Sequence, residues 1–322
     1  NERFRDESYT SLLVMNYDTF QTLYTIKYEA PHILTDKIDA ELQKFNLSLN
    51  PFNPNSIIAK VNNNEAVEVD EWFTEVFNKS MEVSRNSDGV FDITCAPLVN
   101  LWGFGFNKKD SVTPAMIDSL KTFVGYRKVH LEGKKVVKDD PRLLLNCSAI
   151  AKGYSCDVIA RLLEKEGVEN YMILIGGEVV VKGVNQNGVC WRTGINLPED
   201  DPDGIKNNYD EIVQLCKKGA IATSGNYRNF YIKDGKKYAH TIDPRTGYPA
   251  EQSVLSATIV ANDCMTADAY ATAFMAMGLE KARQMADSLP EIEYYVIYAD
   301  ENGKHQIEYS KGMLQYLPKR KQ

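Results

Sequence analysis

Several features that mark particular protein classes are scarce or missing in this sequence of 322 residues. No apolar run reaches the roughly 20 residues that a membrane-spanning helix needs. Only four histidines occur (His32, His130, His240 and His305), so any histidine chemistry must use one of them. Acidic residues outnumber basic ones by 44 to 37, and the net charge of −7 argues against a general nucleic-acid binder.

The common nucleotide-binding motifs are also missing. Gly103 and Gly105 begin a Gly-x-Gly pattern, but Lys108 stands where a dinucleotide fingerprint has its third glycine. Neither a P-loop lysine motif nor a Gly-x-Ser-x-Gly elbow occurs. The sequence therefore does not support a nucleotide site of these kinds.

The cysteines form neither a Cys-x-x-Cys pair nor a zinc-binding spacing. We expect them to be small buried hydrophobic residues, and they do not indicate a redox compartment. The chain begins at Asn1 and carries no signal peptide, so we expect a trimmed or mature form whose targeting is not visible. The six cysteines are Cys95, Cys147, Cys156, Cys190, Cys216 and Cys264.

The composition is that of an ordinary globular protein, with 43% hydrophobic and 25% charged residues. Expected strands outnumber helices and occur in runs rather than in strict strand–helix alternation. This favours an α+β fold of mixed, mostly antiparallel sheets packed with helices. No linker composition divides the chain, so we expect one catalytic unit over residues 1–322, with two lobes.

Hydrophobic periodicity and turn residues predict the individual elements. Helices are expected over residues 34–45, 70–85, 151–166 and 266–289. Strands are expected over residues 22–28, 90–94, 143–145, 171–175, 254–261 and 294–298, with a hairpin over 227–238.

The segment DCMTADAYAT opens the last long helix. Asp268 and Thr272 are four residues apart, so both side chains lie on one helical face. A carboxylate and a hydroxyl there form a hard oxygen pair suited to Mg²⁺. The alternative is that Asp268 complements the helix dipole while Thr272 only packs.

The segment AKGYSCD places Lys152 at an expected helix start. Free backbone N–H groups and this lysine can hold an anionic group. The alternative is a plain helix start with a surface lysine.

Gly176 and Gly177 follow a fully apolar strand. Glycines there let a backbone approach a ligand closely, but a β-bulge explains them equally well.

The segment HTIDPRTG places His240 beside a rigid turn after an expected strand. Asp243-Pro244 favours turn initiation, and Gly247 supplies a positive φ. Catalytic residues often lie on such loops, whereas a lone histidine is usually structural.

Taken together, these segments resemble the ApbE family of FAD:protein FMN transferases, in order and over nearly the whole chain. GVFDITCAPLVNLWGFG (89–105) is close to the family's AFDITVGPLVNLWGFG. Similar matches join SAIAKGYSCD to GGIAKGYAVD, AHTIDPRTGYP to SHIIDPRTGxP, and MTADAYATAFMAMG to MTADALATALFVLG. TLYTIKY, NPNS, ILIGGE and AIATSGNY match further family segments more loosely. The implied fold is ApbE-like and related to the T-fold.

The resemblance implies an enzyme that binds FAD with Mg²⁺ and cleaves the FAD pyrophosphate. FMN would pass through a phosphoester to a threonine of a client flavoprotein, a subunit of an RNF- or NQR-type redox complex, and AMP would be released. The family is typically exported, so the resemblance implies the periplasmic side of the inner membrane and a lipid anchor outside this chain.

The resemblance also implies roles for individual residues. The metal would be held by the Ala149 carbonyl, Asp268 and Thr272, with Asp268 and His240 as the catalytic residues. His240 would assist attack by taking the proton of the threonine hydroxyl. The implied cofactor-binding residues are Phe20, Phe52, Val90, Phe91, Asp92, Lys152, Asp157, Gly176, Gly177, Thr223 and Ile242.

The sequence departs from the family pattern at several of these segments. Phe20-Gln21 replaces the usual Met-Gly, and residues 146–149 (NCSA) replace Asp-Leu-Gly-Gly before the IAKG segment. Glu178 and Asn226 each replace an aspartate. Two other functions remain open on the sequence: an FAD pyrophosphatase with water as acceptor, and a non-catalytic FAD-binding protein.

Overall fold

The computed structural model describes residues 9–16, 22–104, 112–199, 208–226, 230–233, 236–239, 241–250 and 253–318. Among these residues, no helix combines the length and the apolar character needed to cross a bilayer.

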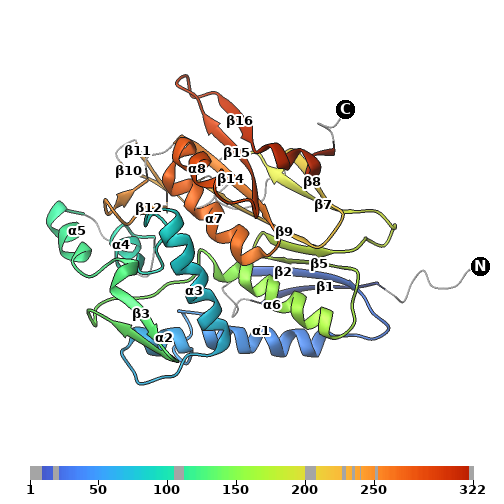
Figure 1. The fold of residues 1–322 in the computed structure, drawn as a ribbon, viewed down its shortest axis with the longest axis horizontal. Helices are drawn as coiled ribbons and strands as arrows, with labels where there is room; N and C mark the ends of the chain where they lie inside the picture. Colours follow the sequence, from blue (N-terminus) through green and yellow to red (C-terminus); the bar gives the residue numbers. More distant parts are fainter. Residues whose placement is uncertain are drawn as a thin grey trace, which may run out of the picture.

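An eight-stranded sheet forms the centre of the molecule (Figure 1). Its strand order is β1-β2-β5-β6-β9-β14-β15-β16, and every neighbouring pair is antiparallel. The expected α+β class with mostly antiparallel sheets is therefore confirmed. The strands are β1 (Tyr9–Asn16), β2 (Thr22–Glu29), β5 (Tyr171–Ile175), β6 (Glu178–Lys182), β9 (Gly219–Gly225), β14 (Val254–Ala261), β15 (Ile292–Ala299) and β16 (His305–Tyr309).

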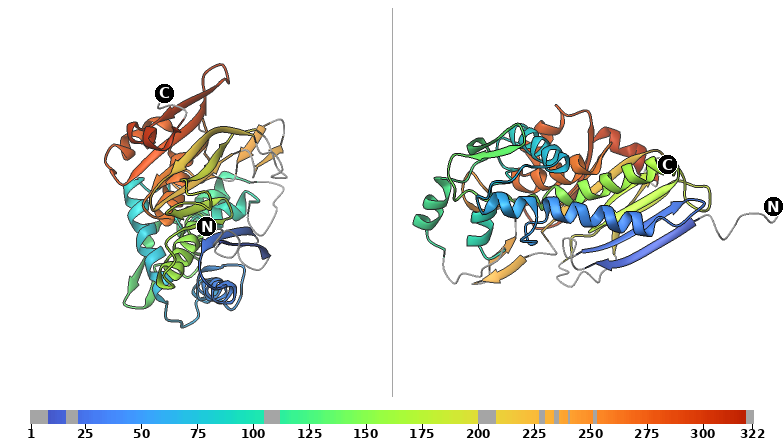
Figure 2. Two further views of the ribbon diagram at one scale, coloured as in Figure 1. Left: turned by 90° about the vertical axis from the view of Figure 1, so that its right-hand side faces the viewer. Right: turned by 90° about the horizontal axis from the view of Figure 1, so that it is seen from below.

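Helices cover one face of this sheet (Figures 1 and 2). Side chains alternate across a strand, and in β5 the odd-numbered residues pack with α1 and α6 while Met172 and Leu174 face the other way. The helices of this layer are α1 (Thr35–Leu49), α3 (Glu71–Asn86), α6 (Ala151–Lys165) and α7 (Cys264–Met277).

Helix α7 lies at the centre of the helical layer. It contacts β9, β14, α6 and α3, and twelve of its fourteen residues are buried. A helix that is buried all round reads as apolar throughout, which explains its alanine- and methionine-rich sequence. Asp268 is therefore a carboxylate inside a mostly apolar helix, and a buried charge needs a partner or a ligand.

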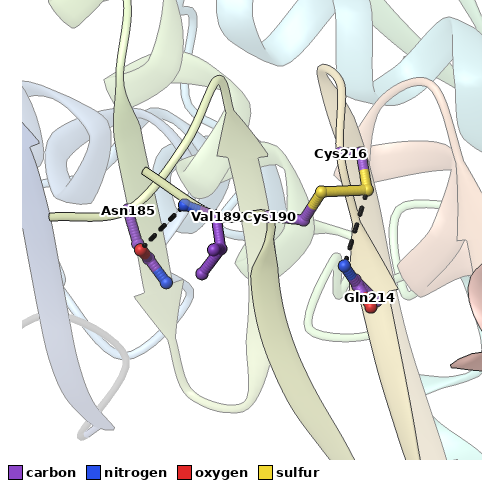
Figure 3. Close-up of a disulfide and its surroundings, with 5 residues drawn as sticks. All are labelled: Asn185, Val189, Cys190, Gln214 and Cys216. Atoms are coloured by element: carbon purple, nitrogen blue, oxygen red, sulfur yellow. Dashed lines mark hydrogen bonds between the residues drawn. A yellow bond between two sulfur atoms is a disulfide. The ribbon is translucent and has the colours of Figure 1, made fainter. Parts of the chain in front are cut away.

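The opposite face of the sheet is covered by a hairpin and a 3₁₀ helix. These are β7 (Trp191–Asn196), β8 (Tyr209–Leu215) and η2 (Lys311–Tyr316), which share an apolar cluster with the sheet. A disulfide between Cys190 and Cys216 joins the outer ends of β7 and β8 (Figure 3). The expectation of six buried thiols is thus wrong for this pair, because antiparallel pairing brings residues distant in sequence to one position. The other four cysteines are buried and free.

The remaining elements lie around the edge of these layers. The turn at Gly247 packs closely on α5, and Ile242 shares a cluster with α4 and α5. These elements are α2 (Ile57–Asn62), α4 (Ala96–Leu101), α5 (Pro114–Lys121), η1 (Tyr126–Lys128), β3 (Val129–Glu132), β4 (Lys135–Lys138), β10 (Phe230–Lys233), β11 (Lys236–Ala239), β12 (Ile242–Asp243), β13 (Tyr248–Pro249) and α8 (Leu279–Ala286).

Two expected strands are loops in the structure. Residues 90–94 form no strand pairing, because Asp92 instead accepts hydrogen bonds from the Thr94 N–H and hydroxyl, at 2.8 and 2.7 Å. Residues 143–145 pair with a side chain rather than with a strand. Asn62 Oδ1 accepts from the Leu145 N–H, and Asn62 Nδ2 donates to the Leu145 carbonyl. Both segments are apolar because they are buried. Sequence periodicity cannot distinguish a short buried loop from a buried strand.

The expected helix over 266–289 is two helices. Gly278 separates α7 from α8 with φ 78° and ψ 162°, a backbone conformation that is essentially restricted to glycine. The apolar periodicity continues past this point, so the sequence pattern alone does not reveal the break.

Candidate functional site

Helices α6 and α7 cross at Gly153, and this contact places the predicted metal ligand. A Cβ added to Gly153 would collide with the Cys264 carbonyl and lie 2.7 Å from the Asp268 Cβ. The close approach lets the Gly153 N–H donate to Asp268 Oδ2 at 2.9 Å. The glycine of the AKGY segment therefore fixes Asp268 against the start of α6.

Three charged side chains meet beside this crossing. Lys152, on the first turn of α6, places its Nζ 2.5 Å from Glu178 Oε1 and 3.9 Å from Asp268 Oδ1. Both carboxylates are buried, at 3% exposure, whereas Lys152 is partly exposed. Glu178 Oε2 has no hydrogen-bond partner among the described residues. The cluster thus carries one carboxylate more than its lysine can balance.

The electrostatics follow from burial. Desolvation raises the pKa of Asp268, and the nearby Lys152 charge offsets this only in part. Desolvation also raises the pKa of Glu178, again against the pull of Lys152. Burial alone would lower the pKa of Lys152, but the two carboxylates outweigh it and raise that pKa. A further positive charge nearby would stabilise the ionised form of each buried carboxylate.

The glycine pair forms the turn between β5 and β6, with φ of 65° at Gly176 and 110° at Gly177. An added Cβ at Gly176 would lie 2.9 Å from Thr22 Oγ1, 3.1 Å from Lys152 Cδ and 3.3 Å from Glu178 Oε2. The turn therefore belongs to the charged cluster and is not a β-bulge.

The predicted residues Thr272 and Thr223 lie on different faces of the sheet. Thr272, on α7, hydrogen-bonds with Ser224 at 3.3 Å, so Ser224 faces the helices. Thr223 precedes it in β9 and pairs with Thr258 at 2.8 Å on the other face. Ser224 is thus the β9 hydroxyl that contacts the predicted metal ligand Thr272, and no sequence motif pointed to it.

Asp157 connects the two helices at a second point. Its Oδ1 and Oδ2 accept from the N–H groups of Cys264 and Met265, both at 2.8 Å. Both oxygens therefore serve the start of α7, which makes Asp157 a residue that positions the helix carrying Asp268. Desolvation raises the pKa of Asp157 to about 7, despite the two hydrogen bonds.

A second group of predicted residues lies in the loop after α3 and in β12. Val90 and Phe91 are buried, and Asp92 Oδ2 accepts from the Tyr126 N–H at 2.8 Å. Ile242 is also buried, in the turn that follows residue 240. An ion pair between Arg245 and Asp88, at 3.4 Å, joins this turn to the loop before Val90. Arg245 also holds Asp243 through two side-chain hydrogen bonds.

The other predicted residues are placed less closely. Ala149 is two residues before α6, in the turn that leads to the charged cluster. Phe52 is 51% exposed in the turn between α1 and α2, whereas the Phe91 ring lies in the core. Phe20 and His240 lie outside the described residues.

The predicted ligands Asp268, Thr272 and Ala149 offer the kind of oxygen atoms that Mg²⁺ prefers. Within the described ranges, no group of three or more His, Cys, Asp or Glu side chains is arranged to hold a metal. A cation at Asp268 would therefore also need hydroxyl and carbonyl oxygens, such as Thr272 and Ala149. Mg²⁺ prefers oxygen ligands and binds through one or two carboxylates.

Comparisons with known proteins place the chain in a family. The model of the ApbE family matches residues 20–296. The chain belongs to the ApbE family. The FAD:protein FMN transferase of Vibrio cholerae is 37% identical over 281 residues, covering 84% of this chain and 83% of that protein. The Escherichia coli K12 protein of the same name is 33% identical, covering 78% of this chain and 73% of its own length.

Solved ApbE structures share the fold. The flavin transferase ApbE from Vibrio cholerae superposes with a TM-score of 0.85 at 34% identity, over 96% of this chain and 99% of that chain. The flavinyl transferase ApbE from Pseudomonas stutzeri, in its apo form, gives 0.84 at 26% identity, over 98% and 99%. The resemblance drawn from sequence motifs is therefore confirmed at the level of family and fold.

Proposed function

We propose that this chain is an FAD:protein FMN transferase that depends on Mg²⁺. The observation that carries the proposal is the open Asp268 Oδ1, held at the α6–α7 crossing beside Lys152 in a member of the ApbE family. A buried carboxylate oxygen next to an ammonium is suited to binding a cation and a phosphate group together.

The predicted ligands of the cation are Asp268, Thr272 and the Ala149 carbonyl. When bound, Mg²⁺ would supply positive charge against the pyrophosphate oxygens, which an acidic protein otherwise repels. Lys152 would add its positive charge to the binding of a phosphate, and Gly176 would leave room for the substrate near Lys152.

The transfer step needs a threonine of a client flavoprotein. Its oxygen would form a bond to the phosphorus of the FMN half while the bridging bond to the AMP half breaks. The bridging oxygen leaves with AMP, and the hydroxyl proton goes to His240. Threonine as acceptor, AMP as product and an RNF- or NQR-type complex as client are all part of the proposal.

The proposal extends to the place where the protein works. We propose that it is exported to the periplasmic side of the inner membrane and held there by a lipid anchor. The Cys190–Cys216 disulfide supports an oxidising compartment, because such bonds are rare in the reducing cytosol of most bacteria.

The test is an incubation of the protein with FAD, Mg²⁺ and a client domain that carries a Ser/Thr-Gly-Ala-Thr acceptor segment. Mass spectrometry of the client should show one FMN added to a threonine. Asp268→Asn should lower the rate at least 100-fold, because it removes the charge of the one carboxylate among the predicted ligands. Asp287→Asn, at the exposed end of α8, is the matched control and should keep full activity.

The other products separate the alternatives. FMN and AMP formed without any client would favour a pyrophosphatase. FAD that stays intact with Mg²⁺ and client present would favour a binding protein. A client of unchanged mass in every assay would contradict the proposed transfer.

A further inference from the structure

Three charged groups share one site in this protein, and their spacing is unequal. Lys152 Nζ is within hydrogen-bond distance of Glu178 Oε1, at 2.5 Å, but not of Asp268 Oδ1, at 3.9 Å. The lysine is therefore paired with Glu178 and only close to Asp268.

This pairing leaves one particular atom available. Asp268 Oδ2 is occupied by the Gly153 N–H, at 2.9 Å. Among the described residues, no hydrogen-bond or ion-pair partner lies closer to Asp268 Oδ1 than the Lys152 ammonium, at 3.9 Å. If Lys152 moved from Glu178 to Asp268, it would place its own positive charge where a cation needs to bind.

We propose that Glu178 is a positioning residue that holds Lys152 away from Asp268, so that Asp268 stays free to bind a divalent cation. This rests on the proposed function only in assuming a cation at Asp268. Glu178 is well placed for the role because it begins β6, directly after the Gly176-Gly177 turn, and its side chain is buried at 3% exposure. A buried carboxylate held by the backbone of a central strand is a fixed point toward which a flexible lysine is drawn.

The dependence on Lys152 distinguishes this role of Glu178 from direct metal binding. A ligand would contribute to affinity whether or not Lys152 is present. A residue that acts by holding Lys152 becomes dispensable once the lysine charge is removed. A double-mutant cycle between Lys152 and Glu178 therefore decides between the two.

The experiment measures the affinity of the full chain for Mn²⁺ alone by isothermal titration calorimetry. Glu178→Gln should weaken binding 10-fold or more, the usual effect of removing a partner that orients a metal ligand. The double variant Lys152→Met/Glu178→Gln should recover to within about threefold of Lys152→Met alone, because no ammonium is left to compete. The Mn²⁺ affinity of Glu178→Asp should lie between those of wild type and Glu178→Gln, since the shorter side chain still carries a carboxylate that attracts Lys152.

The controls make each outcome decisive. Glu164→Gln removes a carboxylate of the same kind, which pairs with Lys218 at 2.8 Å further along α6, and should leave Mn²⁺ affinity unchanged. Circular dichroism of each variant tests for loss of fold. If Glu178→Gln does not fold, Glu178→Asp should still bind Mn²⁺ more weakly than wild type, and adding Lys152→Met should remove that difference. Wild-type affinity in Glu178→Gln, or equal weakness in the single and double variants, would overturn the inference, as would a wild-type chain that binds no Mn²⁺.

The inference and the proposed function fail in different ways. A wild-type chain that shows the predicted Mn²⁺ cycle but transfers no FMN would contradict the function and keep the inference. If the chain transfers FMN normally but Glu178→Gln leaves its Mn²⁺ affinity unchanged, the inference is contradicted and the proposed function stands.

Discussion

Single residues at the α6–α7 crossing decide the geometry of the candidate site. Gly153 permits the contact, Asp268 receives the N–H that the contact delivers, and Glu178 takes up Lys152. The AKGY and TADA segments predict Lys152 and Asp268 as site residues from sequence alone, because a lysine and a carboxylate are recognisable chemical groups. The role of Gly153 was not recognisable, since the reason for a glycine lies in what would collide with its Cβ.

Gly153→Ala should separate the two helices. The new Cβ would meet the Cys264 carbonyl and the Asp268 Cβ, and overpacking of this kind costs about 1–3 kcal/mol. We expect a lower melting temperature and a loss of FMN transfer larger than the loss of stability explains. Gly219→Ala is the matched control, because its added Cβ has its nearest neighbour at 3.6 Å. Equal stability and activity of the two variants would contradict a packing role for Gly153.

At the scale of elements, Asp157 ties the start of α7 to α6. The carboxylate accepts two backbone N–H groups at that start, yet burial raises its pKa to about 7. Between about pH 4 and 7 the folded chain therefore keeps a proton that the unfolded chain has lost. Stability contributed by this group must fall as the pH rises through that window.

Asp157→Asn should remove this pH dependence. Free energies of unfolding from urea titrations should show a difference between wild type and variant that changes by up to about 1.4 kcal/mol per pH unit between pH 4 and 7. The weakened hydrogen bonding should lower the variant's free energy of unfolding by a roughly constant amount at every pH. As the pH rises, the variant should become more stable relative to wild type, because only wild type loses the contribution of the protonated carboxyl. Parallel stability curves for the two proteins would show that Asp157 ionises normally in the folded state.

The elements also show where sequence periodicity was sufficient. The helix over 70–85 and the strand over 171–175 were predicted almost to the residue, and Asp70 caps its helix by accepting from the Phe73 N–H. The strands predicted over 90–94 and 143–145 were wrong because burial alone made them apolar. The break at Gly278 was missed because apolar residues occur on both sides of it.

At the scale of the whole molecule, the Cys190–Cys216 disulfide lies entirely in the β7–β8 hairpin that covers one face of the central sheet. It closes the hairpin β7–β8 across 26 residues of sequence, on the face opposite α7 and the charged cluster. A bridge of this span destabilises the unfolded chain by about 3.5 kcal/mol, because it limits the conformations that the chain can adopt. It therefore contributes to stability without contacting the site.

Cys190→Ser/Cys216→Ser should lower the free energy of unfolding by about 2–4 kcal/mol. Hydrogen exchange should increase most in β7 and β8, and Mn²⁺ binding should not change. Reduction of the wild-type protein with dithiothreitol should reproduce the same loss, while the double variant should not respond to it. A variant as stable as wild type would show that the hairpin is held by its packing alone.

The sequence by itself determined the family, the α+β class and the chemical groups of the site, because motifs and composition record which side chains are present. The two lobes, the location, the bound Mg²⁺ and the roles of all the predicted site residues stay predictions. Only the tertiary structure decided which carboxylate pairs with Lys152, that Ser224 and not Thr223 faces Thr272, and which cysteines bond. Those choices depend on distances between elements far apart in the chain, and no local pattern of residues contains such distances.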